Sequence, residues 1–366
     1  MQRNALWVIY GEDPAAMAQE VLEASGAASL FAAGMKVGLK PNLVVAKPCG
    51  SGATTTPGVV EGTVRFLRDH GIRDLEILEG SWTGDSTRRA FRVCGYEDLA
   101  HRYGLRLTDL QRDGSQTVKA TGGTLAVCPS VLRLDALVNL PVLKGHCQTG
   151  MTCALKNLKG CIPDSEKRRY HTLGIHGPVA LLNTVLRPVL ALVDAIQGDP
   201  VFEEGGTPVR LDRLILGTDP VLVDCYGAQL LGLDPASVDY IGMAEELGVG
   251  CSGLESAVVT ELGKESMRRA LVPDPGSRER LAGRVEARDA CSACYGGLLH
   301  ALRRLEEEGR LDRLEGKIRI GQGFRGVDGE GIGVGRCAAG FGRNLPGCPP
   351  TARRILSFLA DQPPEP

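Results

Sequence analysis

The sequence has few aromatic residues, no dominant charge of one sign and no long apolar run. Aromatic side chains make up 4% of the residues, with only 2 Trp. Lys plus Arg number 42 and Asp plus Glu 44, so the net charge of -2 creates no field that would attract nucleic acid or an anionic membrane. We therefore expect no nucleic-acid partner and no membrane association.

Export and membrane-spanning signals are also missing. The apolar run at residues 5–10 is too short for a secretory signal. The most apolar later stretch, residues 178–197, is interrupted by Asn183, Arg187 and Pro188, so it does not have the pattern of a membrane span. These features predict a cytoplasmic protein.

Three common enzyme motifs do not occur in the sequence. It has no phosphate-binding G-x4-G-K-[ST] run, no G-x-G-x-x-G after the first predicted strand, and no G-x-S-x-G nucleophile turn. A simple hydrolase and an ordinary dehydrogenase are therefore disfavoured.

The chain does contain enough apolar material for a large core, together with many glycines and cysteines. Hydrophobic residues are 43% of the 366 residues, and there are 48 Gly and 12 Cys. Without an export signal, this many cysteines indicates thiolate chemistry or a metal site rather than disulfides.

Short apolar runs alternate with helical patterns over residues 1–270, which predicts one α/β domain with a mostly parallel sheet and flanking helices. The run at 136–144 is almost continuously apolar, as is typical of a strand buried on both faces. Strands are predicted at residues 5–10, 35–40, 75–78, 105–110, 124–128, 136–144, 189–196 and 213–217.

Capping residues locate several helices between these strands. Thr56 and Pro57 are typical of an N-cap and a first helical position, and Pro220 follows a cap at Thr218 or Asp219. Further helices are predicted at residues 13–24, from about 149 to 160, and from Pro178.

A change in composition separates the end of the chain from this domain. Residues 271–284 are rich in Pro, Gly and charge and are predicted to be a linker, and residues 285–366 a small separate unit. Within that unit we expect a helix near 295–309, a strand at 317–321 and a glycine-dense loop at 321–347, with no repeat of fixed period.

Four cysteines of the C-terminal unit predict a [4Fe-4S] cluster. Cys291 and Cys294 form a C-x2-C pair before a helix, Cys337 lies in the glycine-dense loop, and Cys348 precedes a Pro, as the last ligand of ferredoxin-type runs does. A structural zinc site and ordinary thiols are the alternatives. Zinc ribbons usually have two close pairs, whereas Cys337 and Cys348 are widely spaced, so we favour iron–sulfur.

The remaining cysteines carry weaker signals. One set has no standard ligand spacing and could supply a second metal or redox site, or simply pack: Cys49, Cys147, Cys153 and Cys161. A second set has apolar neighbours and is expected in the core: Cys94, Cys128, Cys225 and Cys251.

Polar residues follow several predicted strands, at the edge where ligands bind to open parallel sheets. Lys144 and His146 follow the strand at 136–143, and three threonines begin a helix whose free N–H groups suit an anion. This clustering predicts a phosphate or carboxylate ligand, with Lys144, His146 and Lys156 as catalytic residues. Substrate-binding roles are assigned to Lys40, Asn42, Thr54, Thr55, Asn157, Asp194 and Asp219.

Each of these residues also has a structural interpretation. A single Lys is often a solvated surface residue, Asp219 is a natural N-cap, and the threonines can simply cap the helix. His146 could be a hydrogen-bonded core residue, and Asp224 is either a cleft carboxylate or the polar edge of a buried helix.

Five segments together resemble the family called domain of unknown function 362. They are "KPNLV" at 40–44, "ATTTP" at 53–57, "TGMTCALKNLKG" at 149–160, "VDAIQGDPVFEEGG" at 193–206 and "GTDPVLVDCYGAQLLGLDP" at 217–235. The tail with "CSAC" and "GCPP" is similar to that of the iron–sulfur-bearing members of the family.

The resemblance implies an α/β core and an iron–sulfur protein of a kind frequent in anaerobic bacteria and archaea. Many members carry compact C-x2-C-x2-C-x3-C-P runs, which this tail does not, and Cys153 and Cys161 stand where small residues are expected. The residues that would line the shared cleft are Lys40, Asn42, Thr55, Lys144, His146, Thr152, Lys156, Asn157, Asp194, Asp219 and Asp224.

The sequence thus predicts an iron–sulfur oxidoreductase that delivers single electrons from a [4Fe-4S] cluster to a small anionic substrate or cofactor. Three lysines, Lys40, Lys144 and Lys156, would hold the anion, His146 would supply a proton, and a ferredoxin would be a suitable electron donor. Two alternatives remain: an electron-transfer or accessory protein without its own chemistry, and a non-redox lysine and histidine enzyme with a structural metal.

Overall fold

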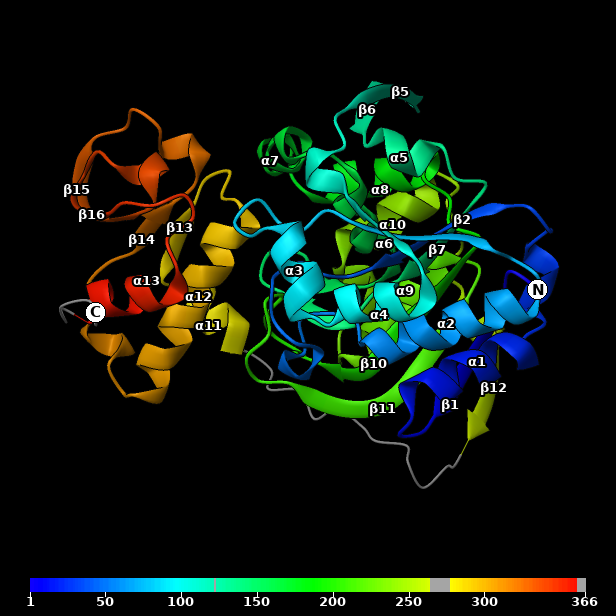
Figure 1. Ribbon diagram of the computed structural model, residues 1–366. Coiled ribbons are helices and arrows are strands. Elements are labelled where there is room, and N and C mark those ends of the chain that lie inside the picture. The colour runs from blue at the N-terminus through cyan, green and yellow to red at the C-terminus, as the bar shows by residue number, and fades with distance from the viewer. Residues whose placement is uncertain (122, 264–276, 361–366) are drawn as a thin grey trace. The chain divides into compact units, whose positions relative to one another are not determined.

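The computed structural model describes residues 1–121, 123–263 and 277–360 (Figure 1). The chain forms two compact units, of which the first comprises Met1–Lys167 and His176–Pro273. The second comprises Arg168–Ile175 and Asp274–Pro366. Part of the predicted linker, 271–276, lies outside the described residues, and Ser277–Ala282 forms helix α11.

The first unit is built on an eight-stranded sheet with the order β12-β1-β11-β10-β7-β2-β3-β4. Its neighbouring strands are parallel except that β11 runs antiparallel to both β1 and β10. The predicted α/β fold with a mostly parallel sheet is therefore confirmed. The strands are β1 (Ala5–Tyr10), β2 (Lys36–Pro41), β3 (Asp74–Glu79), β4 (Arg106–Asp109), β7 (Ala136–Leu140), β10 (Leu190–Gly198), β11 (Val209–Gly217) and β12 (Val258–Gly263).

Helices pack on both faces of this sheet (Figure 1). On one face, four helices share an apolar core with the strands: α1 (Pro14–Ala24), α2 (Pro57–Asp69), α3 (Thr87–Val93) and α4 (Tyr96–Tyr103). A second group of helices packs together and contacts β7, β10 and β11: α6 (Ala154–Asn157), α8 (His176–Val185), α9 (Pro220–Leu230) and α10 (Asp239–Glu246).

The alternation of side chains along a strand decides which residues face each helix layer. In β2, Val37 and Leu39 belong to the core beneath α1 and α2, so Gly38 and Lys40 point to the opposite face. Asn139 of β7 points the same way and donates to the carbonyl of Ala154 in α6. This opposite face carries the polar residues.

Two local predictions differ from the structure. The strand at 124–128 is real but forms β6 (Gly123–Val127), which pairs only with β5 (Gln116–Ala120). The helix predicted from about 149 begins at Ala154, because Gly150–Thr152 forms β9 and pairs with β8 (Lys144–His146). A 3-10 helix, Leu158–Cys161, continues from α6.

Unit 1 contains two further helices, α5 (Pro129–Leu132) and the first part of α7 (Asp164–Thr172). The second unit has a four-stranded parallel sheet, β13 (Val285–Ala287), β14 (Ile318–Ile320), β15 (Gly329–Val334) and β16 (Phe341–Leu345). Its other helices are α12 (Ser292–Glu307) and α13 (Ala352–Leu359).

The glycine-dense segment at 321–347 is not one loop, because it contains β15 and β16. Strands β14 and β15 are each followed by a glycine with positive φ, Gly321 at +120° and Gly335 at +91°, and then by one 3-10 turn. We call residues 321–326 and 335–340 the two glycine turns. The recurrence is difficult to detect in the sequence, because the two copies found among the described residues share few residues.

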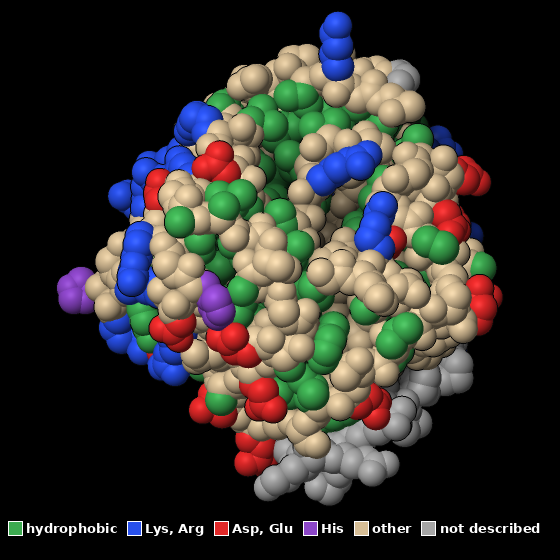
Figure 2. Space-filling view, turned by 90° about the vertical axis from the view of Figure 1, so that its right-hand side faces the viewer, with side chains coloured by type: hydrophobic (Ala, Val, Ile, Leu, Met, Phe, Trp, Pro, Cys, Tyr) green, Lys and Arg blue, Asp and Glu red, His purple; other side chains and the backbone are tan. Residues whose placement is uncertain are grey.

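Charges of both signs occur on the face drawn in Figure 2. This agrees with the near balance of Lys plus Arg against Asp plus Glu in the sequence. No helix among the described residues is both long enough and apolar enough to cross a bilayer.

We predict opposite effects for alanine at two helical glycines of the first unit. A Cβ at Gly62 in α2 would overlap the Ala15 carbonyl oxygen of α1 and lie 2.8 Å from the Ala18 Cβ, whereas a Cβ at Gly242 in α10 meets nothing within 4 Å. Gly62→Ala should lower the free energy of unfolding by about 1–3 kcal/mol, and Gly242→Ala should raise it by about 0.5–1 kcal/mol.

Urea unfolding followed by tryptophan fluorescence measures both effects, since Trp7 and Trp82 lie in the first unit. Equal effects of the two substitutions would contradict the tight contact between α1 and α2.

Candidate functional site

Lys40 is fully buried at the end of β2 and forms an ion pair inside the protein. Its Nζ lies 2.7 Å from Glu79 Oε1 at the end of β3, and it also donates to the Pro41 carbonyl at 2.7 Å. The other carboxylate oxygen, Oε2 of Glu79, accepts the backbone N–H of Leu43 at 2.7 Å. The charge of Lys40 is thus compensated within the chain, which makes it a poor anchor for an external anion.

Lys144 begins the β8 strand and is also buried, but its partners are neutral. Its Nζ donates to Asn42 Oδ1 at 3.0 Å, to the Glu203 carbonyl at 2.7 Å and to the Ala53 carbonyl. Burial, with the nearby charge of Lys156 as the second cause, lowers the pKa of Lys144 to about 7. Lys144 can therefore hold or release a proton near neutral pH.

Lys156, the third residue of α6, has a single hydrogen-bond partner among the described residues, Thr152 Oγ1 at 3.3 Å. Burial lowers the pKa of Lys156 to about 8, although the charges of Glu203 and Cys147 oppose this. The remaining N–H bonds of Lys156 make it the best placed of the three lysines to bind an anion.

Asp224 fixes the position of the short helix that carries Lys156. Its Oδ1 accepts the backbone N–H of Ala154 at 2.7 Å, and Oδ2 lies 3.3 Å from the N–H of Leu155. Burial raises the pKa of the Asp224 carboxyl to about 7. Asp224, a polar residue of the buried helix α9, thus anchors the N-terminus of α6 by hydrogen bonds.

His146, Cys147 and Glu203 form a compact buried group beside the lysines. Glu203 Oε1 lies 3.5 Å from His146 Nε2 and 3.2 Å from Cys147 Sγ. Nδ1 of His146 accepts the backbone N–H groups of Gln148 and Thr149 at 3.1 and 3.2 Å. The neutral ring therefore carries its proton on Nε2, which faces the Glu203 carboxylate.

Among the described residues, this trio has the ligand types and spacing to hold a metal ion, since its donor atoms all lie within 4.8 Å of one another. Two features oppose a cation there. An ion on Nε2 of His146 would displace the proton that the two hydrogen bonds at Nδ1 place on that nitrogen. The ammonium group of Lys156 is also close enough for its charge to interact with those of Cys147 and Glu203.

The helix N-terminus expected to bind an external anion is already occupied. At the start of α2, the backbone N–H of Thr56 donates to the Asp194 carboxylate at 2.7 Å. Thr55 Oγ1 accepts the N–H of Asn42 at 2.8 Å and donates to the Leu140 carbonyl at 2.7 Å, and Thr54 donates to the Lys47 carbonyl. These residues shape the loop around the site.

Asp219 does not join the other predicted residues. Because β11 is antiparallel, its last residue, Gly217, pairs with Leu6 near the start of β1 and with Ala191 near the start of β10. Asp219 caps α9 by accepting the N–H of Val221 at 2.9 Å and also accepts that of Cys251. The premise that all strand ends converge fails for this residue.

Asn157 connects the residues around the three lysines by hydrogen bonds. Three residues of this network were not predicted from the sequence. Asn157 accepts from the Asn42 side chain at 2.9 Å and donates to Asn139 Oδ1 at 2.8 Å. Asn139 and Glu79 lie at the ends of buried strands, where a polar residue in an apolar run is a usable signal. The missed residues are Glu79, Asn139 and Glu203.

Four cysteines come together in the second unit. Cys291 and Cys294 lie at the start of α12, Cys337 lies in the second glycine turn, and Cys348 follows β16. Burial and the charges of Cys291, Cys348 and Cys337 raise the pKa of the Cys294 thiol to about 12. No three of their sulfurs lie within 4.8 Å of one another, as far as the described residues show.

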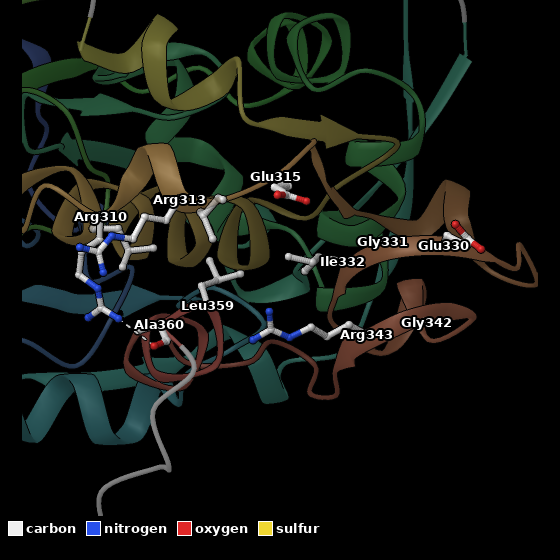
Figure 3. A pocket seen from close by; sticks show the side chains of 12 residues that line it. Arg310, Arg313, Glu315, Glu330, Gly331, Ile332, Gly342, Arg343, Leu359 and Ala360 are labelled. Atoms are coloured by element: carbon white, nitrogen blue, oxygen red, sulfur yellow. Dashed lines mark hydrogen bonds between the residues drawn. The ribbon is translucent and has the colours of Figure 1, made fainter.

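A separate cavity of about 690 Å³ lies in the second unit (Figure 3). It is lined in part by Leu305 near the end of α12, whereas the C-x2-C pair lies at the helix start. Arg310 donates to the Ala360 carbonyl at 2.8 Å and Arg343 to the Phe358 carbonyl at 2.6 Å. These arginines cap the end of α13, and nothing further is required to explain them.

The fold and these contacts define an α/β protein with a buried lysine and carboxylate site and a second, cysteine-bearing unit. The model of the family described as "Domain of unknown function (DUF362)" matches residues 37–229, and the chain belongs to this family.

One protein with a similar sequence and one solved structure match the chain. The chain is 26% identical over 234 residues to the thylakoid-associated protein sll1697 of Synechocystis sp., which covers 61% of this chain and 71% of the relative. A lactate racemase apoprotein from Thermoanaerobacterium thermosaccharolyticum matches at a TM-score of 0.39 and 12% identity, over 63% of this chain and 58% of that one.

Asp224 gives a pH prediction. Burial raises its pKa from 3.8 to about 7, so the folded state binds more protons than the unfolded state in this range. The free energy of unfolding should therefore fall as pH rises from about 4 to about 7, by about 1.4 kcal/mol for each unit of difference in pKa. In Asp224→Asn, the amide oxygen still accepts from Ala154 but does not titrate, so this fall should become smaller. Burial also raises the pKa values of Glu204 and Asp194, and these two groups contribute to the part of the fall that remains.

Urea unfolding at intervals between pH 4.5 and 8 measures the slope. Asp234→Asn is the control, because Asp234 is an exposed carboxylate that caps a short helix by accepting the N–H of Ala236 at 3.0 Å. A slope in Asp224→Asn as steep as that of the wild type would contradict the role given to Asp224.

Proposed function

We propose that this protein is an iron–sulfur oxidoreductase with a [4Fe-4S] cluster on Cys291, Cys294, Cys337 and Cys348. The main support for this proposal is that the four cysteines lie close enough for their charges to interact. They come from three separate segments of the second unit. Such a cluster, when bound, supplies or accepts one electron at a time.

The spacing of the sulfurs supports a polynuclear cluster over zinc. Around one zinc ion, Zn–S bonds of about 2.3 Å bring tetrahedral sulfurs to about 3.8 Å from one another. Within the described part of the chain, no three of these four sulfurs approach within 4.8 Å. The corners of a cubic cluster separate the thiolates more widely than a single zinc ion does.

The substrate side of the proposal rests on the lysines of the first unit. Lys156 would bind a phosphate or carboxylate through its unused N–H bonds, and Lys144 would add positive charge and exchange a proton near neutral pH. His146 would donate the proton on Nε2, for which Glu203 is the present acceptor. These residues offset the negative charge that an anion gains on reduction.

Two other functions remain alternatives. An electron-transfer or accessory protein would use the same cysteines without chemistry at Lys156, and a non-redox enzyme would use the lysines and His146 with a structural metal. The lowered pKa of Lys144, about 7, is the observation that favours considering the second. A cytoplasmic location and a ferredoxin-like electron donor belong to the proposal.

Anaerobic purification with measurement of iron, acid-labile sulfide and zinc tests the cluster. We expect about four irons per chain and an EPR signal after dithionite reduction, both lost or strongly reduced in Cys348→Ser. Cys251→Ser is the matched control: Cys251 was expected in the core, but it is exposed like Cys348 and lies in the first unit. Stoichiometric zinc, or iron that both variants retain, would contradict the proposal.

Anion binding at Lys156 is tested by the thermal shift that inorganic phosphate and oxalate each produce. A ligand present at 100 times its Kd stabilises the folded state by about 2.7 kcal/mol. Lys156→Met should abolish that shift, while Lys119→Met, at an exposed lysine of β5, should retain it. An equal shift in both variants would exclude Lys156 as the anion anchor.

A further inference from the structure

The two glycine turns of the second unit occupy equivalent positions but carry different side chains. In the second turn Cys337 follows Gly335 and Arg336, and in the first the corresponding position is Gly323. A Cβ at Gly323 would lie 2.8 Å from the Arg288 Cβ, so a side chain there would crowd the preceding strand connection. The first turn therefore contributes no thiol.

The first turn instead directs two hydrogen-bond donors at the cysteines. Arg325 Nε donates to Cys337 Sγ at 3.4 Å, and Gln322 Nε2 donates to Cys291 Sγ at 3.7 Å. Arg325 Nη2 also donates to Gln322 Oε1 at 3.2 Å, so the two donors orient each other. One linked pair thus spans two sulfurs that belong to different elements.

The charge of Arg325 has no carboxylate partner in the described part of the chain. Other arginines of the second unit pair with acids, as Arg284 does with Asp312 at 2.8 Å and Arg288 with Glu286 at 2.8 Å. The guanidinium is therefore oriented by sulfur, although the side chain itself is exposed.

We propose that Arg325, aligned by Gln322, is a positioning residue that raises the reduction potential of the cluster held by the four cysteines. This inference rests on the proposed function. Reduction adds one electron from an external reductant, such as dithionite or a ferredoxin, and so adds one negative charge to the centre. A fixed positive charge and an N–H···S bond stabilise that reduced state more than the oxidised state.

A potentiometric titration followed by EPR tests the inference on the full-length, cluster-loaded protein. In Arg325→Gln the equilibrium constant for reduction should fall about tenfold, which for one electron is about 59 mV toward more negative potential. Arg336→Gln is the matched control, because Arg336 is an exposed neighbour of Cys337 with no hydrogen bond to sulfur among the described contacts. It should shift the constant by less than threefold.

Gln322→Leu and Arg325→Lys provide the second measurement. Gln322→Leu should give a smaller shift in the same direction, and Arg325→Lys should lie between wild type and Arg325→Gln, because charge is kept but the oriented N–H is lost. If Arg325→Gln does not assemble a cluster, the reduction potentials of Gln322→Leu and Arg325→Lys, compared with that of the wild type, test the inference instead. A shift no larger than that of Arg336→Gln, or wild-type potentials in both, would overturn the inference.

The two failures are distinguishable. Wild-type protein without iron and sulfide would refute the proposed function itself. A loaded wild-type protein whose potential is insensitive to Arg325 would leave the cluster intact and refute only the role of the arginine.

Discussion

The ion pair between Lys40 and Glu79 is the constraint around which the polar side of the first unit is arranged. Both groups are buried at the carboxyl ends of adjacent parallel strands, and removing either would leave an uncompensated charge, at a cost of about 3–5 kcal/mol. Glu79 also fixes the chain after β2 by accepting from Leu43. The loop that follows supplies Asn42, Ala53 and the start of α2.

From this pair the network extends by hydrogen bonds rather than by further ion pairs. Asn42 and Asn157 connect the loop to α6, and Lys144 donates to three neutral oxygens. The three lysines therefore differ in their partners. The charge of Lys40 is compensated by Glu79, the ammonium group of Lys144 donates to neutral oxygens, and Lys156 keeps N–H bonds available. The difference among three lysines that look alike in sequence comes from their partners.

Much of the fold could be predicted from the sequence because it is locally encoded. The strand at 5–10 and the helices after Asp13, Thr56 and Asp219 follow from short-range periodicity and capping residues. The antiparallel direction of β11 could not be predicted, since it depends on pairing between distant segments. For the same reason the position of Asp219, which follows β11, could not be predicted.

The candidate site was predictable in part for the same reason. Its residues at the ends of β2 and β7 follow from the general rule for parallel sheets. Glu203 instead lies in a loop that is held by four hydrogen bonds to Asp199 and by hydrogen bonds from Lys144 and Lys47. The pairing of β8 with β9 replaced the start of the expected helix because a hairpin there satisfies the backbone of Lys144 and Thr152.

The division of the chain between the units has a consequence for the order of biosynthesis. The second unit includes Arg168–Ile175, far upstream in sequence from its other residues. His171 of this segment lies 3.4 Å from Ser292, next to the first cysteine of the C-x2-C pair. Because a chain is synthesised from its N-terminus, Arg168–Ile175 leaves the ribosome before the rest of the second unit has been made. This segment can complete its packing only after residues 274–366 have been synthesised. The segment 274–366 expressed alone would therefore lack part of its own fold.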